Sequence, residues 1–167
     1  LKKFKLYDDN KIILDKAPLN FQLIGYIKML FPDAKIIHCT RNIKDTILSI
    51  YKNVFDASTL TWTYNQDYLV KFAKLYQDLM KFWHHKMPNH IYDCKYEDLV
   101  NNKEIETRNL INFCNIDWED SCFDHTKNKT GIKTVSLSQA RRPVYKSSIN
   151  LYENYIEYLP FLNDLKE

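Results

Sequence analysis

The chain has 167 residues, 45% of them hydrophobic and 14% aromatic, which is enough for one domain with a hydrophobic core. This composition excludes an intrinsically disordered protein, because such a chain buries enough apolar surface to fold. The formal net charge is +3, and no run of Lys and Arg forms a basic arm, so nucleic acid is not indicated as a partner. A modest positive balance suits an anionic ligand held in one pocket.

Glycine and cysteine usage narrows the kinds of site further. The chain has only two glycines, whereas a loop that cradles phosphate needs several together, because its backbone must approach the anion closely. None of the four cysteines forms a C-x-x-C pair, so zinc and thioredoxin-like chemistry lack support. Cys39 and Cys94 lie in apolar runs and are interpreted as buried thiols. Cys114 and Cys122 are close enough in sequence to form a disulfide, but spacing alone does not establish one. Reduced thiols favour a cytoplasmic protein. No apolar stretch reaches the roughly 18 residues that span a bilayer.

The first half of the chain alternates short apolar runs with helical patterns. Residues 11–14 predict a strand, residues 19–30 have apolar side chains at helical spacing, and residues 34–39 predict a buried strand. Asn42 is placed to cap the helix that follows, and Asp45 stands at the position that closes a capping box.

The second half continues the alternation. The predicted elements are a loop over 56–64, a long amphipathic helix over about 66–85, a strand over 90–95, a helix over about 103–114, irregular structure over 117–136 and a helix over 150–159. Strands alternating with helices predict an α/β fold whose parallel sheet is flanked by helices. No repeat or composition shift divides the chain, so residues 1–167 are expected to form a single domain.

Polar side chains follow each predicted strand. Lys16 follows the first strand, Arg41 the second and Tyr96 the third. Ligands of open parallel sheets bind outside the carboxyl ends of the strands, so these groups are expected at one rim if the strands are neighbours. Ser49 lies about two helical turns after Arg41, and a guanidinium and a hydroxyl can clamp one phosphate. Spacing alone leaves the ordinary alternatives open: a surface ion pair, a mid-helix serine and a solvated turn lysine.

An ordered set of motifs then matches a known family. The matching segments are, in chain order, residues 15–21 (DKAPLNF), 30–41 (LFPDAKIIHCTR), 45–49 (DTILS), 95–100 (KYEDLV), 112–114 (NFC) and 136–148 (SLSQARRPVYKSS). This set resembles the sulfotransferases that use 3′-phosphoadenosine 5′-phosphosulfate (PAPS). It is most similar to the tyrosylprotein sulfotransferases and to bacterial relatives that often carry tetratricopeptide repeats ahead of the catalytic domain.

The resemblance implies a fold related to the P-loop kinases and transfer of a sulfuryl group from PAPS to a hydroxyl acceptor, such as a protein tyrosine. It implies that Lys16 stabilises the bridging oxygen and the sulfuryl group as the bond breaks, with Ser136 close by. Sulfuryl transfer is, like phosphoryl transfer, an in-line displacement in which positioning and charge stabilisation dominate. No metal is required by this scheme.

The resemblance also implies how the nucleotide is held. Arg41 and Ser49 would bind the 3′-phosphate of PAPS and of its product, adenosine 3′,5′-bisphosphate (PAP), and Tyr96 would contact the nucleotide near the adenine. The segment that begins at Ser136 would wrap the nucleotide, and its implied contacts are Ser136, Gln139, Arg142 and Tyr145.

Part of the family's pattern is missing. The glycine-containing 5′-phosphosulfate loop and the carboxylate base of the tyrosylprotein members normally precede the segment that starts here. Residues 1–167 therefore resemble the C-terminal portion of a sulfotransferase domain, which we expect to have little or no transferase activity alone. Leu151 stands where the family often has a basic residue. A eukaryotic tyrosylprotein-type enzyme would be expected in the Golgi lumen instead of the cytoplasm.

Other interpretations stay open at this point. A degenerate homologue that binds nucleotide without catalysis, a P-loop kinase relative and a helical scaffold are the alternatives. His84, His85 and His90 gather near the end of the long predicted helix, a pattern typical of a solvated helix end, because a metal site needs more ligands of the right spacing. Glu97 is a carboxylate that could act as a base, but the resemblance implies a structural and nucleotide-binding role for its motif.

Overall fold

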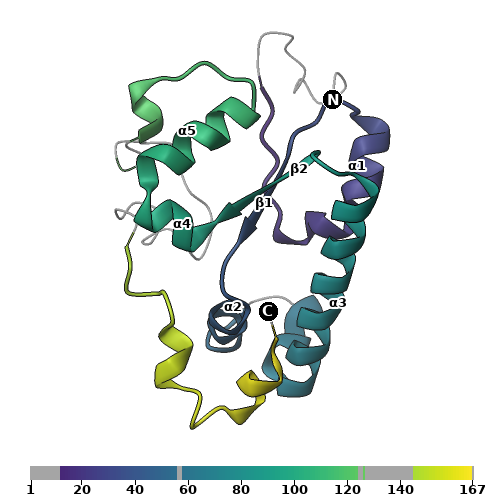
Figure 1. Cartoon of the computed structure of the whole chain (residues 1–167). Helices are drawn as coiled ribbons and strands as arrows, with labels where there is room; N and C mark the ends of the chain where they lie inside the picture. The colour runs from purple at the N-terminus through teal and green to yellow at the C-terminus, as the bar shows by residue number, and fades with distance from the viewer. Residues whose placement is uncertain (1–11, 56–57, 124–125, 127–144, 167) are drawn as a thin grey trace.

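Two parallel strands form the centre of the structure, with helices on either side of them (Figure 1). The computed structural model describes residues 12–55, 58–123, 126 and 145–166. β1 (Ile36–Thr40) pairs in parallel with β2 (Ile91–Lys95) over their whole lengths. A parallel pair needs a crossover of a dozen or more residues, and α2 (Ile43–Tyr51) and α3 (Gln66–Lys86) lie within it. The predicted α/β class with a parallel sheet is confirmed for these residues.

The first predicted strand is wrong. Residues 12–17 have no regular secondary structure, and residue 11 lies outside the described residues. Ile12, Ile13 and Leu14 are 76%, 55% and 82% exposed. A strand exists only when a neighbour takes its backbone hydrogen bonds, and the described part of the sheet contains β1 and β2 alone. The apolar run therefore has β-forming side chains but no strand to pair with.

The helices before and after β1 follow the sequence prediction closely. The 3-10 helix η2 (Pro18–Leu23) leads directly into α1 (Ile24–Leu30), which together cover the helix expected there. α1 ends where the Phe31 N–H donates to the carbonyl of Ile27 at 2.8 Å, just before Pro32, because the residue preceding a proline is disfavoured in the helical region. Asn42 caps α2 as predicted, since its side chain accepts from the N–H groups of Lys44 and Asp45 at 3.0 and 3.2 Å.

The second half departs from expectation in its short elements. The long helix and the last strand are confirmed as α3 and β2. The other elements are η3 (Ser58–Tyr64), α4 (Tyr96–Asn101), α5 (Lys103–Phe113), η4 (Asp120–Phe123), η6 (Leu151–Asn154) and η7 (Pro160–Asp164). Part of the predicted 56–64 loop is thus a 3-10 helix, and α4 begins directly at the end of β2. The helix predicted over 150–159 is instead the short η6 followed by turns, and it starts from Asn150 in the left-handed region (φ 57°).

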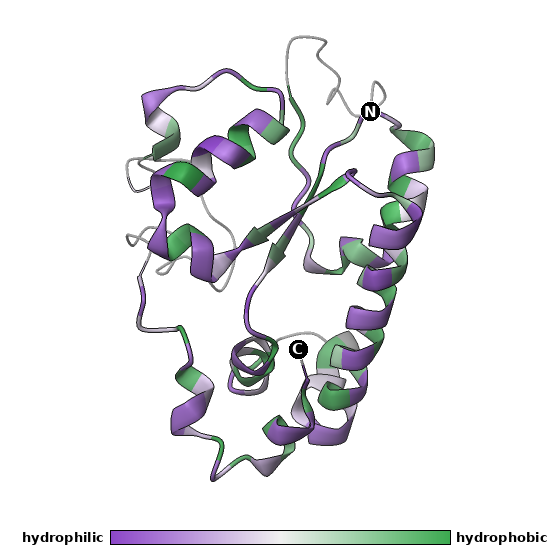
Figure 2. Ribbon diagram, in the orientation of Figure 1, coloured by the Kyte–Doolittle hydropathy of each residue, from purple (hydrophilic) through white to green (hydrophobic). Residues whose placement is uncertain are grey.

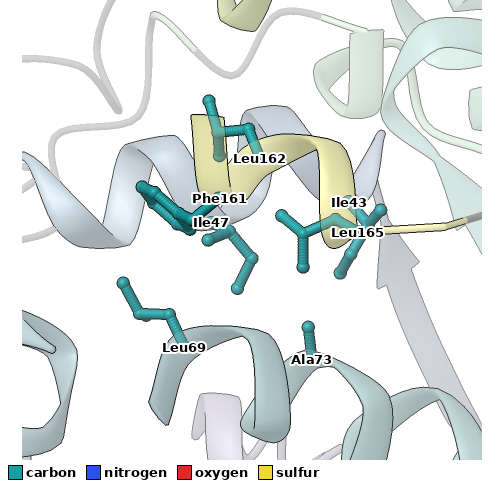
Figure 3. Packing of buried hydrophobic residues seen from close by; sticks show 7 residues of the cluster. All are labelled: Ile43, Ile47, Leu69, Ala73, Phe161, Leu162 and Leu165. Carbon is teal, nitrogen blue, oxygen red and sulfur yellow. The ribbon is translucent and has the colours of Figure 1, made fainter. Parts of the chain in front are cut away.

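The main core lies where α2, α3 and η7 meet (Figure 3). Its buried residues are Ile43, Ile47, Leu69, Ala73, Phe161, Leu162 and Leu165. Figure 2 shows hydrophobic and hydrophilic residues alternating along α3, as expected of an amphipathic helix whose apolar stripe packs inward. The C-terminal segment is therefore fixed to the same two helices that connect the strands.

A second, smaller cluster joins α1, α3 and the start of β2. Ile24, Met80 and Ile91 are buried there. The Trp83 indole N–H of α3 donates to the carbonyl of Phe21 at 2.9 Å. Gly25 permits this close approach, because a Cβ at that position would lie 2.8 Å from the Trp83 ring. No helix within the described ranges is long and apolar enough to cross a bilayer.

Candidate functional site

Arg41 and Tyr96 lie side by side at the carboxyl ends of the two strands. The last paired residues of the sheet are Thr40 and Lys95, so Arg41 and Tyr96 are the residues that directly follow β1 and β2. The guanidinium carbon of Arg41 lies 5.6 Å from the centroid of the Tyr96 ring, within the range of a cation–π contact. The structure therefore brings together two of the three polar groups that the sequence placed at this rim.

The Arg41 guanidinium has partners at one nitrogen, Nη2, and lacks one at another, Nε. Its Nη2 donates to the carbonyl of Ser148 and lies 3.4 Å from the Asp45 carboxylate. Its Nε is buried and has no hydrogen-bond partner among the described residues. A buried donor without a hydrogen bond costs about 1–3 kcal/mol of stability, and more when the group is charged. An anion is the natural acceptor for this N–H, because guanidinium groups bind phosphate oxygens with paired hydrogen bonds.

Asp45 organises the backbone around this arginine. The residue is buried, with 1% exposure. Its two carboxylate oxygens accept hydrogen bonds from the N–H groups of Asn150 and Tyr152, both at 2.8 Å. The predicted capping-box role of Asp45 is therefore wrong. The Asn42 N–H that it would have bonded donates instead to Glu97 Oε1 at 2.9 Å, so Glu97 ties the start of α2 to α4.

Residues 145–152 form a segment that contacts residues just after both strands, and we call it the C-terminal strap. The Tyr96 hydroxyl donates to the carbonyl of Tyr145 at 2.6 Å, at one end of the strap. At the other end, the Lys44 ammonium lies 5.2 Å from the centroid of the Tyr152 ring. In Figure 1 this part of the chain descends from beside α4 toward η6. The strap thus contacts both of the elements that follow the strands.

Ser49 lies two turns along α2 from Arg41 and is half-buried. Asp45 stands between them at four-residue spacing, so the carboxylate shares the face on which the phosphate clamp was expected. The Ser49 hydroxyl has no hydrogen-bond partner in the described part of the chain, while its carbonyl accepts from the Asn53 amide at 2.6 Å. Ser49 is therefore available to a ligand, but Asp45 separates it from Arg41.

The structure does not bring Lys16 to the strand ends by any contact among the described residues. Lys16 is exposed on the segment that lacks a strand, next to Asp15, whose carboxylate accepts a hydrogen bond from the Asn20 side chain at 2.9 Å. Tyr145 reaches the site through its backbone carbonyl. The remaining predicted contacts, Ser136, Gln139 and Arg142, lie outside the described residues.

Titrating groups around the rim are perturbed by their surroundings. Burial raises the pKa of Tyr96 above its ordinary value, and the charge of Arg41 opposes that rise, so Tyr96 is a neutral hydrogen-bond donor at neutral pH. Cys39 and Cys94 face each other across the strands one register step before Thr40 and Lys95. The prediction that both are buried is wrong for Cys39, which is exposed, and its hydrogen bond with Cys94 lowers the pKa of its thiol to about 6.

Sequence reasoning missed two groups of residues that the structure places in contact. Asp45 is one, and the backbone that it binds lies more than a hundred positions along the chain, where no local pattern could reveal it. Its spacing of four residues from Arg41 was the available signal, because residues so spaced meet on one helical face. The second is a cluster on the α3 side of the sheet that contains His38, His84 and Asp93.

The sequence of this chain matches one family model and is similar to the three proteins described next. Residues 3–120 match the model of the sulfotransferase family. An "Uncharacterized protein" of Aquifex aeolicus is 34% identical over 166 residues, which cover 98% of this chain and 22% of that protein. Zebrafish (Danio rerio) "Protein-tyrosine sulfotransferase 1" is 25% identical over 134 residues, or 78% of this chain and 36% of the relative. Drosophila melanogaster "Protein-tyrosine sulfotransferase" is 24% identical over 146 residues, or 78% of this chain and 26% of the relative.

The chain thus spans between about a fifth and somewhat more than a third of the length of these curated relatives. The family match covers most of the described fold, from before α1 to the start of η4, and it includes both strand ends. On this evidence, the chain belongs to the sulfotransferase family.

Proposed function

We propose that this chain is the C-terminal portion of a P-loop-kinase-like sulfotransferase domain that holds the 3′-phosphate of PAPS at Arg41. The observation that carries the proposal is the buried Nε–H of Arg41, which has no acceptor among the described residues. This donor lies at the carboxyl end of β1, where ligands of parallel sheets bind. An anion at this position would take up the hydrogen bond that the protein leaves unmade.

The surroundings of Arg41 fit a nucleotide phosphate. The Tyr96 ring covers one side of the guanidinium, and the C-terminal strap fixes the other through the Ser148 carbonyl. Because Asp45 is already bonded to two backbone N–H groups, its charge is partly balanced and it competes less for the arginine. In the proposed site Ser49 adds one hydroxyl bond to the phosphate, beyond Asp45 on the same helix. Ser136, Gln139, Arg142 and Tyr145 are proposed to contact the nucleotide.

PAPS, when bound, supplies an activated sulfuryl group whose bond to the bridging phosphate oxygen is the one that breaks. In the proposed reaction this chain's residues bind and orient, with Arg41 fixing the nucleotide end and Lys16 placing positive charge at the leaving oxygen. A charge-stabilising contact of that kind is typically worth on the order of 10²–10³ in rate. The names of the zebrafish and fly relatives support a protein tyrosine as the hydroxyl acceptor.

The test is binding of PAP to the intact protein, measured by calorimetry. Arg41→Ala is expected to weaken binding at least tenfold, because a charge-assisted pair of bonds is lost. Arg41→Lys keeps the charge but lacks the planar fork, so it is expected to fall between Ala and wild type. Arg108→Ala is the matched control, since Arg108 is exposed and paired with Glu104 within α5.

Each outcome has a distinct meaning. Equal PAP affinity of the wild type and Arg41→Ala, with both shown to be folded by circular dichroism, would remove Arg41 from the phosphate site. Tight PAP binding without sulfuryl transfer in the intact protein would favour the non-catalytic homologue. Preference for ATP over PAPS would instead indicate a P-loop kinase relative.

A further inference from the structure

Three potential metal ligands from separate parts of the chain meet on the side of the sheet that faces α3. His38 of β1 and Asp93 of β2 are direct partners across the parallel strands. His38 Nδ1 lies 2.6 Å from Asp93 Oδ1, and His84 Nε2, from the last turn of α3, lies 3.3 Å from the same oxygen. The three ligand atoms all lie within 4.8 Å of one another. Cross-strand pairing alone explains His38 with Asp93, but it does not explain why an imidazole from α3 reaches the same oxygen.

We propose that His38, His84 and Asp93 bind a divalent transition-metal ion of the zinc class, with water as the fourth ligand. Two imidazoles and a carboxylate suit Zn²⁺, whereas Mg²⁺ and Ca²⁺ take mostly oxygen ligands. Zinc bonds of about 2.0–2.1 Å place neighbouring ligands of a tetrahedron about 3.4 Å apart. The spacing of His84 Nε2 and Asp93 Oδ1 already has this value, and the shorter His38 to Asp93 contact needs to open by under an ångström.

The surroundings of His38 prepare its Nδ1 for a metal. Its other nitrogen, Nε2, lies 2.5 Å from the Tyr76 hydroxyl of α3. The Tyr76 ring is in turn fixed edge-on against Phe21, with centroids 5.1 Å apart. In the tautomer whose Nε2–H donates to the Tyr76 oxygen, Nδ1 has a lone pair for a metal ion, which would lie between Nδ1 and Asp93. Metal-binding histidines commonly have a hydrogen-bonded second nitrogen of this kind, which sets the tautomer and the ring orientation.

Charge and proton balance also favour a cation here. An ionised carboxylate only accepts, so the metal-free contact between His38 Nδ1 and Asp93 requires a proton on that nitrogen. Metal binding displaces this proton from Nδ1, either to solvent or, by a change of tautomer, to Nε2, whose N–H then donates to the Tyr76 hydroxyl oxygen. The Asp93 charge offsets part of the metal's charge. The carbonyl end of α3, where His84 lies, adds a favourable field for a cation.

The site is separate from the proposed phosphate site. His38 and Asp93 precede Arg41 and Tyr96 by three residues on their strands, which is about 10 Å along the sheet. The ion would join β1, β2 and the end of α3, and it takes no part in the proposed sulfuryl transfer. His85 and His90 remain exposed as the sequence suggested, whereas His84 does not behave as a merely solvated helix-end residue.

The experiment is a calorimetric titration of the intact protein with Zn²⁺ alone, without nucleotide and with Mg²⁺ as the comparison ion. The wild type is expected to bind Zn²⁺ in the micromolar range or tighter at a single site. His84→Ala and Asp93→Asn are expected to weaken binding at least tenfold, whereas His85→Ala, the adjacent exposed histidine, leaves it unchanged. Cys39→Ser is also expected to leave it unchanged, which separates this site from coordination by thiols.

Cobalt gives a second measurement, which reports the coordination geometry of the bound ion. Co²⁺ bound in a tetrahedral site of nitrogen and oxygen ligands is expected to give visible absorption that His84→Ala abolishes. His84 is partly exposed and Asp93→Asn is isosteric, so these variants avoid the risk that a change at the more buried His38 unfolds the protein. Absence of Zn²⁺ binding by the wild type below about 100 μM, or equal losses in His84→Ala and His85→Ala, would overturn the proposal.

Discussion

The Asp45 carboxylate connects two parts of the chain that are more than a hundred residues apart. From α2, it contacts Arg41, and it accepts backbone hydrogen bonds from Asn150 and Tyr152 of the C-terminal strap. The strap has little regular structure of its own, because η6 is a single short 3-10 helix. Asp45 therefore supplies the acceptors that the beginning of η6 lacks, and it sets the position of the strap relative to Arg41.

Asp45→Asn is expected to lower the free energy of unfolding by about 2–4 kcal/mol, because one buried oxygen becomes an NH₂ group that faces a backbone donor. Equilibrium urea denaturation followed by circular dichroism measures the loss. Asp78→Asn changes an exposed carboxylate on α3 and is expected to stay within about 0.5 kcal/mol of the wild type. Equal stabilities of the two variants would mean that Asp45 does not organise the strap.

Leu162 tests the attachment of the chain's last helical turn to the main core. Its side chain is fully buried (0% exposed) in the cluster that η7 forms with α2 and α3 (Figure 3). Leu162→Ala is expected to cost about 2–5 kcal/mol, because the surrounding core only partly fills the space left behind. Thermal denaturation of Leu162→Ala beside Leu75→Ala, whose side chain is 67% exposed, provides the comparison. A loss no larger than that of Leu75→Ala would show that η7 is not docked as described.

Local patterns in the sequence predicted the elements whose stability is local. The Asn42 cap and the periodicity of α3 each determine structure from neighbouring residues alone. Residues 12–14 have a good strand pattern and form no strand, because a strand depends on a partner that local composition does not describe. The same limit hid the helical character of Tyr96–Asn101, which begins directly at the end of β2.

In the site, too, the sequence predicted what depends on the order of elements, but not the contacts between distant residues. Placement of Arg41 and Tyr96 at adjoining strand ends came from the order of strands and helices, and the sheet register confirms it. The roles of Asp45 and His38 depend on contacts with Asn150 and Asp93, which lie 105 and 55 residues away. No periodicity links such positions, so only the folded arrangement reveals them.

Tyr96 links the titration of a single hydroxyl to the stability of the strap. Its hydroxyl donates to the Tyr145 carbonyl, and burial raises its pKa above the unfolded value of 10.0. A raised pKa means that the folded state holds the proton more tightly than the unfolded state. The resulting stabilisation is complete below about pH 10 and is lost as the pH rises through the folded-state value.

Tyr96→Phe keeps the ring beside Arg41 but removes both the hydrogen bond and the titrating group. The wild type is therefore expected to be more stable than Tyr96→Phe by about 1 kcal/mol at pH 8, which is the usual net value of one hydrogen bond. This difference is expected to shrink at about pH 11, because deprotonation removes the donor in the wild type while the variant has none to lose. Urea denaturation of both proteins at the two pH values measures the change, with Tyr26→Phe, at an exposed position, as the control for the substitution itself. A difference that stays constant across this range would show that the hydroxyl of Tyr96 does not hold the strap.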